Sequence, residues 1–312
     1  QRQMCIRDRA KEDRLNLMKA TNCNFSQIYA LYMDEKHTTL ATIDEQSKAK
    51  ADLEFTDETG VTHRLWIETD EEIIAKLVAD FADRKLYIAD GHHRYETALN
   101  YRNYCRENGI SKPGDPQDFQ MIYLVDMEHP GLVVFPTHRL VRDLPNFDKE
   151  AVLEKCSEFF YIDEKEGTDT MEEDLKKLYD EGKKAFGFYC GKGEWFLLTL
   201  KNIDFMSQML PDVSKASQSL DVSVLHTLIL EKIFGIDKEN MAKQINLTYT
   251  KFFTEAIDGV DKGEFQCSFV LNPTRVTEIR DVAAAGEKMP QKSTYFYPKM
   301  ITGMVMNNLG VD

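Results

Sequence analysis

The residues best suited to chemistry in this sequence form one short run, which consists of Asp90, Gly91, His92, His93 and Arg94. Apolar residues 86–89 precede this 90–94 turn and predict a strand, and the apolar spacing from His93 to Cys105 predicts a helix after it. Glycine permits the tight bend that a strand-to-helix connection needs. Because free amides at a helix start point at an incoming anion, we expect the 90–94 turn to bind phosphate.

Each side chain of the turn has a predicted role. Arg94 can grip phosphate oxygens through two hydrogen bonds, and His92 and His93 supply further donors. Asp90 can bind a metal ion such as Mg²⁺ or accept a substrate proton, so we predict Asp90, His92 and His93 as catalytic residues. The alternative is that Asp90 only caps the helix and that the histidines are ordinary residues of its first turn.

A second pair of donors, His138 and Arg139, follows the predicted strand at residues 132–135. A histidine and an arginine at the end of a strand suit an anion or a carboxylate. The alternative for this pair is a surface loop with solvated charge. We therefore carry His138 and Arg139 as candidate phosphate-binding residues.

The stretch from Gly286 to Thr294 imitates a nucleotide-binding P-loop, but Gln291 stands where the second glycine is required, and a strand follows it. Lys292, Ser293 and Thr294 can still bind a phosphate as isolated donors. Donors buried without a partner are costly, so we expect this segment to share one cleft with the 90–94 turn. The alternative is a solvated Lys292 whose hydroxyl neighbours cap a turn.

Composition narrows the classes of partner. The chain has 312 residues, 42% of them hydrophobic, which is enough for a sizeable core. A formal net charge of -14 argues against nucleic-acid and membrane surfaces, because both would repel it. The six cysteines are scattered without metal-ligand spacing, which is typical of reduced thiols in a cytoplasmic protein. Small molecules are therefore the expected partners, and the oligomeric state stays open.

Alternating helix and strand patterns predict an α/β (α+β) fold with mixed sheets. Residues 1–9 have no apolar periodicity and resemble translated sequencing-adapter sequence, so we expect a non-native tail and a truncated N-terminus. A first domain is expected at residues 10–145 and a second α/β domain at 146–312. Within the second, residues 222–234 predict an amphipathic helix capped by Asp221, with His226 as a core histidine.

From Lys11 to Asp312 the chain resembles the bacterial family named domain of unknown function 1015. The matching segments are residues 11–14, 87–98, 136–140, 220–226 and 289–299. The 90–94 turn is also similar to the nucleotide-phosphate turn of the ParB and sulfiredoxin-like superfamily, which includes ADP-dependent free serine kinases. That similarity implies a ParB/sulfiredoxin-like first domain, bound ADP or ATP, and an acidic base from a more N-terminal segment that this sequence lacks.

Three functions are compatible with these residues. The first is a nucleotide-dependent phosphotransferase, a kinase of serine or a similar small hydroxylated metabolite, in which the turn holds the phosphoryl oxygens. The second is a nucleotide-binding regulator without turnover. The third is a metal-dependent hydrolase with Asp90, His92 and His93 as ligands and His138 as a further one.

Overall fold

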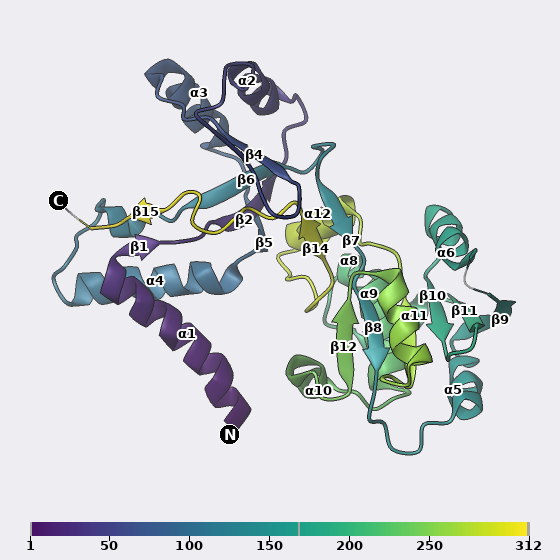
Figure 1. Cartoon of the computed structure of the whole chain (residues 1–312). Helices are drawn as coiled ribbons and strands as arrows, with labels where there is room; N and C mark the ends of the chain where they lie inside the picture. Colours follow the sequence, from purple (N-terminus) through teal and green to yellow (C-terminus); the bar gives the residue numbers. More distant parts are fainter. Residues whose placement is uncertain (1, 168, 311–312) are drawn as a thin grey trace. The chain divides into compact units, whose positions relative to one another are not determined.

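The computed structural model describes residues 2–167 and 169–310 and has the mixed α/β fold that the sequence predicts (Figure 1). The chain forms two compact units. Unit 1 comprises residues 1–132 and 298–312, and unit 2 comprises Val133–Tyr297. Gln1 of the predicted tail, and Val311 and Asp312 of the predicted second domain, lie outside the described residues.

The two units begin and end at different residues from the predicted domains. The chain enters unit 2 at Val133, ahead of the predicted boundary at residue 146, and it returns to unit 1 at Pro298. The return depends on pairing between residues far apart in sequence. Leu309 donates its amide to the carbonyl of Asn22 at 2.6 Å and accepts a hydrogen bond from Gln117 Nε2 at 2.7 Å. Local sequence patterns carry no signal for such contacts.

Unit 1 is built on a three-stranded sheet with the order β5-β2-β6. Strand β2 is the central strand and pairs antiparallel with β5 and parallel with β6. Strand β5 is therefore an edge strand. All five residues of β2 are buried. The elements of unit 1 are α1 (Arg2–Thr21), β1 (Cys23–Asn24), β2 (Ile28–Tyr32), α2 (Thr38–Gln46), β3 (Leu53–Thr56), β4 (Thr62–Leu65), α3 (Glu71–Phe81), β5 (Tyr87–Asp90), α4 (His92–Glu107), a 3₁₀ turn (Pro116–Asp118), β6 (Ile122–Asp126) and β15 (Asn307–Asn308).

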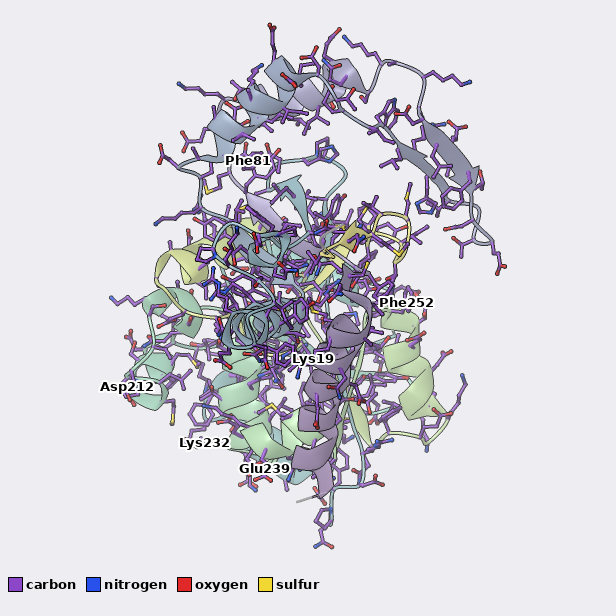
Figure 2. The ribbon with its side chains drawn as sticks, turned by 90° about the vertical axis from the view of Figure 1, so that its left-hand side faces the viewer. Lys19, Phe81, Asp212, Lys232, Glu239 and Phe252 are labelled. Carbon is purple, nitrogen blue, oxygen red and sulfur yellow. The ribbon has the colours of Figure 1, made fainter. Side chains whose placement is uncertain are left out.

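Helices α1 and α4 pack together and fix the position of the turn between β5 and α4. Met18 of α1 and Tyr101 and Cys105 of α4 form a buried cluster with Leu309. The ammonium of Lys19, which Figure 2 labels on α1, lies 4.0 Å from the centre of the Tyr104 ring. Such cation–π contacts contribute about 0.5 to 1 kcal/mol at exposed sites.

Unit 2 is built on a six-stranded sheet with the order β12-β8-β13-β10-β11-β9. A two-stranded ladder of β7 and β14 accompanies it. The elements are β7 (Val133–Phe135), β8 (His138–Val141), α5 (Lys149–Cys156), β9 (Phe160–Glu166), α6 (Met171–Asp180), β10 (Ala185–Tyr189), β11 (Glu194–Leu200), α7 (Asp204–Met209), α8 (Lys215–Gln218), α9 (Asp221–Val224), the π-helix η2 (Leu225–Glu231), α10 (Lys238–Lys243), β12 (Leu247–Thr250), α11 (Phe253–Asp261), β13 (Cys267–Val270), α12 (Val276–Ala284) and β14 (Tyr295–Tyr297).

Both faces of the six-stranded sheet are covered, which explains why its central strands are almost wholly apolar. Helices α5 and η2 pack on one face, where Phe186 and Phe188 of β10 point, and α6 and α11 pack on the other. Gly187 lies between Met171 and Val270, and a Cβ there would come within 2.6 Å of Val270 Cγ2. This close approach requires glycine at position 187.

Unit 2 differs from the sequence interpretation in three places. The alternative of a surface loop for His138 and Arg139 was wrong, because both residues are buried in β8. The predicted continuous helix at residues 222–234 becomes the π-helix η2 after Val224, with hydrogen bonds from Lys232 N to Thr227 O and from Phe234 N to Ile229 O. Asp221 does not cap it, since its carboxylate instead pairs with Lys184 Nζ at 3.0 Å.

No helix within residues 2–167 and 169–310 combines the length and the apolar character that crossing a membrane requires.

Candidate functional site

The 90–94 turn connects β5 to α4, as predicted. Gly91 is the N-cap of α4 and has φ 96° and ψ 21°, a left-handed conformation that glycine adopts without strain. No side chain caps the helix. A Cβ on Gly91 would lie 2.8 Å from Arg94 Nε, so a larger residue there would displace the guanidinium from the position that it occupies. The first-turn amides of α4 therefore lie next to Arg94 with no capping side chain among the described residues.

Asp90 lies between two cations. Lys299 Nζ is 2.8 Å from Asp90 Oδ2, and Arg94 Nη2 is 3.6 Å from the same oxygen. Arg94 also donates through Nη1 to the carbonyl of Gln27, just before β2. These contacts hold both the carboxylate and the guanidinium at the end of the sheet. Lys299 was missed as a site residue, although it belongs to the 289–299 segment of the family resemblance.

The two cations determine the protonation of Asp90. Partial burial raises the pKa of Asp90, but the hydrogen bond and charge of Lys299 and the charge of Arg94 outweigh it. The net result is a pKa below the usual value for aspartate. Asp90 is therefore ionised at neutral pH and suited to orient a hydroxyl group.

A cavity of about 540 Å³ opens at the turn. Gly91, His92, His93 and Arg94 line it, and Arg14 of α1 adds a further cation. Its lining also includes the apolar side chains of Leu17, Met18 and Phe25. A cavity of this size, lined by cationic and by apolar side chains, fits an anion that carries a flat organic group.

A smaller cavity of about 200 Å³ adjoins the same residues. It shares Ser26, Asp90 and Arg94 with the large cavity and is also lined by Tyr123 and Lys299. Asp90 is the only carboxylate among the described residues that line either cavity. One carboxylate and one guanidinium thus face two adjoining spaces.

The two histidines of the turn differ in their surroundings. His92 is exposed, and His93 is partly buried with its Nδ1 3.4 Å from Glu96 Oε2. Both line the large cavity. Their predicted catalytic role stays a prediction, and so does their role as phosphate donors.

The structure gives His138 and Arg139 partners within unit 2. His138 Nδ1 accepts a hydrogen bond of 3.4 Å from the amide of Leu271. Arg139 donates to the carbonyls of Thr137 and Lys292 and to His226 Nε2. Burial in β8 gives the two residues structural partners, and phosphate binding by them stays a prediction.

The segment from Lys292 to Thr294 contacts Arg139 and Thr274 of unit 2 through its backbone carbonyls. Lys292 has a left-handed φ of 54° and an exposed side chain. Its carbonyl accepts from Arg139 Nη2 at 3.0 Å, and the carbonyl of Ser293 accepts from Thr274 Oγ1 at 3.1 Å. Binding of phosphate by Lys292, Ser293 and Thr294, and the cleft shared with the 90–94 turn, stay predictions.

The predicted metal-dependent hydrolase requires a cluster of metal-binding side chains. Within residues 2–167 and 169–310 there is no group of three or more histidine, cysteine, aspartate or glutamate side chains that could hold a metal ion. Asp90, His92 and His93 of the turn are therefore not part of such a group within unit 1. Asp90 alone could contribute one oxygen to Mg²⁺.

Comparison with known proteins gives one family match. The family model described as "Protein of unknown function (DUF1015)" matches residues 6–223. That span includes the 90–94 turn and agrees with the resemblance seen in the sequence. No curated protein matches the chain.

Several solved structures are similar to this chain. A conserved hypothetical protein from Pyrococcus furiosus is 16% identical, covers 97% of this chain and 88% of its own length, and has a TM-score of 0.42. A mutant free serine kinase in complex with AMP is 12% identical over 93% of this chain and 80% of its own, with a TM-score of 0.43. The mutant in complex with ADP has the same identity and coverage and a TM-score of 0.42.

Proposed function

The chain belongs to the DUF1015 family, whose description names no activity, and we propose from the site itself that the 90–94 turn binds the phosphates of a nucleotide, ADP or ATP. The observation that carries this proposal is the uncapped start of α4 beside Arg94, at the wall of a cavity of about 540 Å³. Helix amides and a guanidinium are the donors that phosphate prefers.

The remaining walls of the large cavity support a nucleotide rather than free phosphate. Arg14 adds positive charge to the lining, while Leu17, Met18 and Phe25 offer apolar surface. A nucleobase is flat and has a π-face that can lie against an aromatic ring such as Phe25. The cavity is also larger than a phosphate group requires, because it lies within the usual range for drug-sized ligands, about 300 to 1,000 Å³.

We further propose transfer of a phosphoryl group to a small hydroxylated metabolite such as serine, held in the smaller cavity. A hydroxyl oxygen of that metabolite would attack the terminal phosphorus, and the bond to the bridging oxygen would break, so that the nucleotide leaves one phosphate shorter. Asp90, shared by both cavities, would orient the hydroxyl and take its proton. Arg94 and Lys299 would neutralise charge that develops on the phosphoryl oxygens.

Mg²⁺ fits this proposal only as a companion of the nucleotide. The described residues around the two cavities offer it one carboxylate, Asp90, and the other ligands would come from phosphate oxygens and water. Mg²⁺ would supply charge neutralisation between the phosphates.

Isothermal titration with ADP, ATP and serine, with and without Mg²⁺, tests binding, and an assay for phosphoserine tests transfer. Arg94→Ala should weaken nucleotide binding by about 1.5 to 3 kcal/mol, since it removes a charged hydrogen bond. Arg102→Ala, which changes an arginine of α4 that lines neither cavity, is the matched control.

The outcomes separate the alternatives. Nucleotide affinity that is the same in the wild type and in Arg94→Ala would contradict the phosphate site. Binding of nucleotide without phosphoserine, or any other phosphorylated hydroxyl compound, would favour a regulator that uses the same turn as a sensor.

A further inference from the structure

A second large cavity lies wholly within unit 2. Its volume is about 530 Å³, and its lining residues come from the segments between Leu210 and Gln291. Most of its lining surface is apolar, and Leu210, Val213 and Met241 contribute to it, while several polar and charged side chains, His226 among them, also line the cavity. It shares no lining residue with the cavities at the 90–94 turn.

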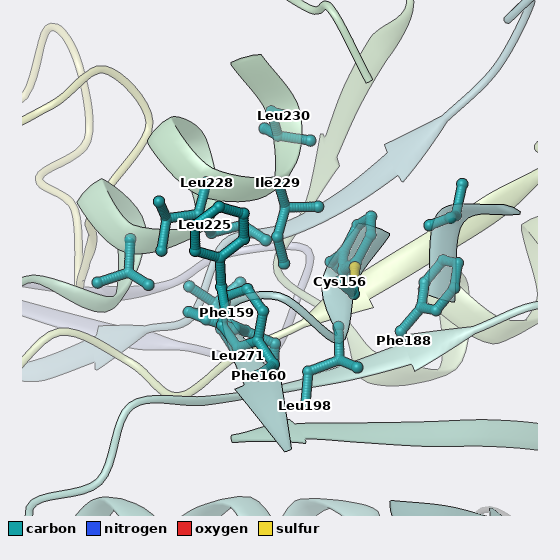
Figure 3. Close-up of a cluster of buried hydrophobic side chains, with 14 of the residues drawn as sticks. Cys156, Phe159, Phe160, Phe188, Leu198, Leu225, Leu228, Ile229, Leu230 and Leu271 are labelled. Carbon is teal, nitrogen blue, oxygen red and sulfur yellow. The ribbon is translucent and has the colours of Figure 1, made fainter. Parts of the chain in front are cut away.

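The π-helix η2 forms part of this wall. Leu225, Leu228, Ile229 and Leu230 of η2 point into the buried core, as Figure 3 shows. His226, Thr227 and Glu231 of the same helix line the cavity instead. π-Helical segments are rare and are frequently found at functional sites. His226 lies in this π-helix and lines the cavity.

Behind His226 lies Arg139, which is fully buried in β8. Its guanidinium donates to two backbone carbonyls and to His226 Nε2, and it lies 5.2 Å from the centre of the Tyr249 ring. Among the described residues no carboxylate forms an ion pair with Arg139, and its Nε has no hydrogen-bond acceptor. Burial lowers the pKa of Arg139 only to about 10, so a positive charge without a counterion is buried beside the cavity.

The contact with Arg139 fixes the tautomer of His226. A guanidinium can only donate, so His226 Nε2, 3.1 Å from Arg139 Nη2, must accept. Burial and the charge of Arg139 hold the pKa of His226 well below its usual value, so the ring is neutral and its proton is on Nδ1. No described residue accepts a hydrogen bond from this Nδ1–H in the structure.

We propose that the unit 2 cavity binds an organic monocarboxylate with an apolar body, its carboxylate accepting a hydrogen bond from His226 Nδ1. The carboxylate supplies the acceptor that His226 lacks and the negative charge that Arg139 lacks. The apolar body lies against Leu210, Val213 and Met241. Ligands of this kind match cavities that are mostly apolar with a few well-placed polar groups.

The charged residues at the cavity do not offer an equivalent anchor. Glu287 accepts hydrogen bonds from Ser214 and Ser217, so it is engaged within the protein. Lys238 and Lys288 also line the cavity, but both are exposed, so solvent screens their charges, and Glu231 brings a negative charge to the same wall. Among the described residues that line the cavity, His226 is hydrogen-bonded to the buried Arg139, whereas Tyr249 contacts the guanidinium only through its ring.

Calorimetric titration with 2-naphthoate and decanoate tests the proposal, with 2-naphthamide as the uncharged match of the first probe. We expect one molecule of at least one carboxylate to bind per chain, and 2-naphthamide to bind about tenfold more weakly or worse. His226→Leu should weaken carboxylate binding by about tenfold or more, whereas His226→Gln should retain it, because an amide can accept from Arg139 and donate to the ligand.

Two further variants separate loss of carboxylate binding from loss of folding and from failure of the proposed nucleotide site. Ala242→Trp changes an exposed residue of the cavity wall, so it should fill the cavity and abolish binding without disturbing the core. Arg94→Ala, in unit 1, should leave carboxylate binding unchanged while weakening nucleotide binding. The proposal is overturned if neither carboxylate saturates the wild type, if 2-naphthamide binds as tightly as 2-naphthoate, or if Ala242→Trp binds like the wild type.

Discussion

The ammonium of Lys299 lies 2.8 Å from Asp90 Oδ2, although 209 positions separate the two residues in sequence. Arg94 approaches the same oxygen from the start of α4. The carboxylate that faces both cavities of unit 1 is thus held ionised by one local and one distant cation. The charge state and orientation of Asp90 therefore depend on the C-terminal segment, residues 298–312, as well as on the 90–94 turn.

Lys299→Met should raise the pKa of Asp90, because the hydrogen bond and the nearer positive charge are lost. The lowered pKa contributes stability above the usual pKa of aspartate, and that stability is lost as the pH falls through the lowered value. Since both side chains are more than a third exposed, the loss should be about 0.2 to 1 kcal/mol. Carboxyl carbon NMR titration measures the pKa directly.

Lys48→Met is the control for that titration, because it removes an exposed lysine paired with Glu45 elsewhere in unit 1. An Asp90 that titrates at the same pH in Lys299→Met and in the wild type would show that Lys299 does not hold the carboxylate.

Gly91→Ala should weaken binding of phosphate-bearing ligands and destabilise the protein. The left-handed conformation at Gly91 costs an L-residue about 1 to 2 kcal/mol, and the new Cβ would push the Arg94 guanidinium away. Denaturant unfolding and nucleotide titration measure the two effects. Gly60→Ala, at a positive φ with nothing within 4 Å of the added Cβ, should reproduce the strain without loss of binding. Equal binding by Gly91→Ala and the wild type would exclude the predicted clash.

How far the sequence predicts this site depends on how local each contact is. The β5-to-α4 turn follows from a short apolar strand, one glycine and helical spacing, all within twenty residues or so of each other. Lys299 could not be found this way, because its pairing with Asp90 depends on the return of the C-terminal segment, residues 298–312, to unit 1. Arg14, which also lines the large cavity, was missed because the packing of α1 against α4 brings residues distant in sequence to the turn.

Unit 2 shows a different limit. Charged residues are rarely fully buried, so a histidine and an arginine after a proline were assigned to a strand end or a surface loop. In the structure Arg139 is fully buried because Thr137, Lys292 and His226 supply acceptors for its guanidinium. The π-helical turn at η2 also has no sequence signature that distinguishes it from an ordinary amphipathic helix.

His138→Gln should make the protein less sensitive to acid. Burial, with the charge of Arg139, lowers the pKa of His138 to about 4, against 6.5 for the free side chain. The neutral ring therefore contributes stability above pH 6.5, and this contribution is lost as the pH falls toward 4, by about 3 kcal/mol in total. Glutamine does not titrate and can still accept from the amide of Leu271.

Denaturant unfolding between pH 4 and pH 7 measures the effect as the difference between variant and wild type. His129→Gln is the matched control, because His129 Nδ1 also accepts from a backbone amide, that of Gly131, but at an exposed site. A difference that does not change across this range would mean that His138 is not held neutral by burial.

Asp221→Asn should have the opposite pH dependence. Burial, with a smaller contribution from the charge of Glu278, raises the pKa of Asp221 to about 6 despite the ion pair with Lys184. An acid whose pKa is raised in the folded state favours folding when protonated, so its contribution to stability falls as the pH rises from about 4 to 6 and is constant above that. At pH 7 the free energy of unfolding of the variant should thus exceed that of the wild type by about 1 to 3 kcal/mol, and at pH 4 the two should differ little. Denaturant unfolding at the two pH values measures the difference.

Asp258→Asn is the control, because it changes an exposed acid paired with Lys262, and it should give no such pH-dependent gain. If Asp221→Asn were less stable than the wild type at pH 7, the ion pair with Lys184 would outweigh the cost of burying the carboxylate.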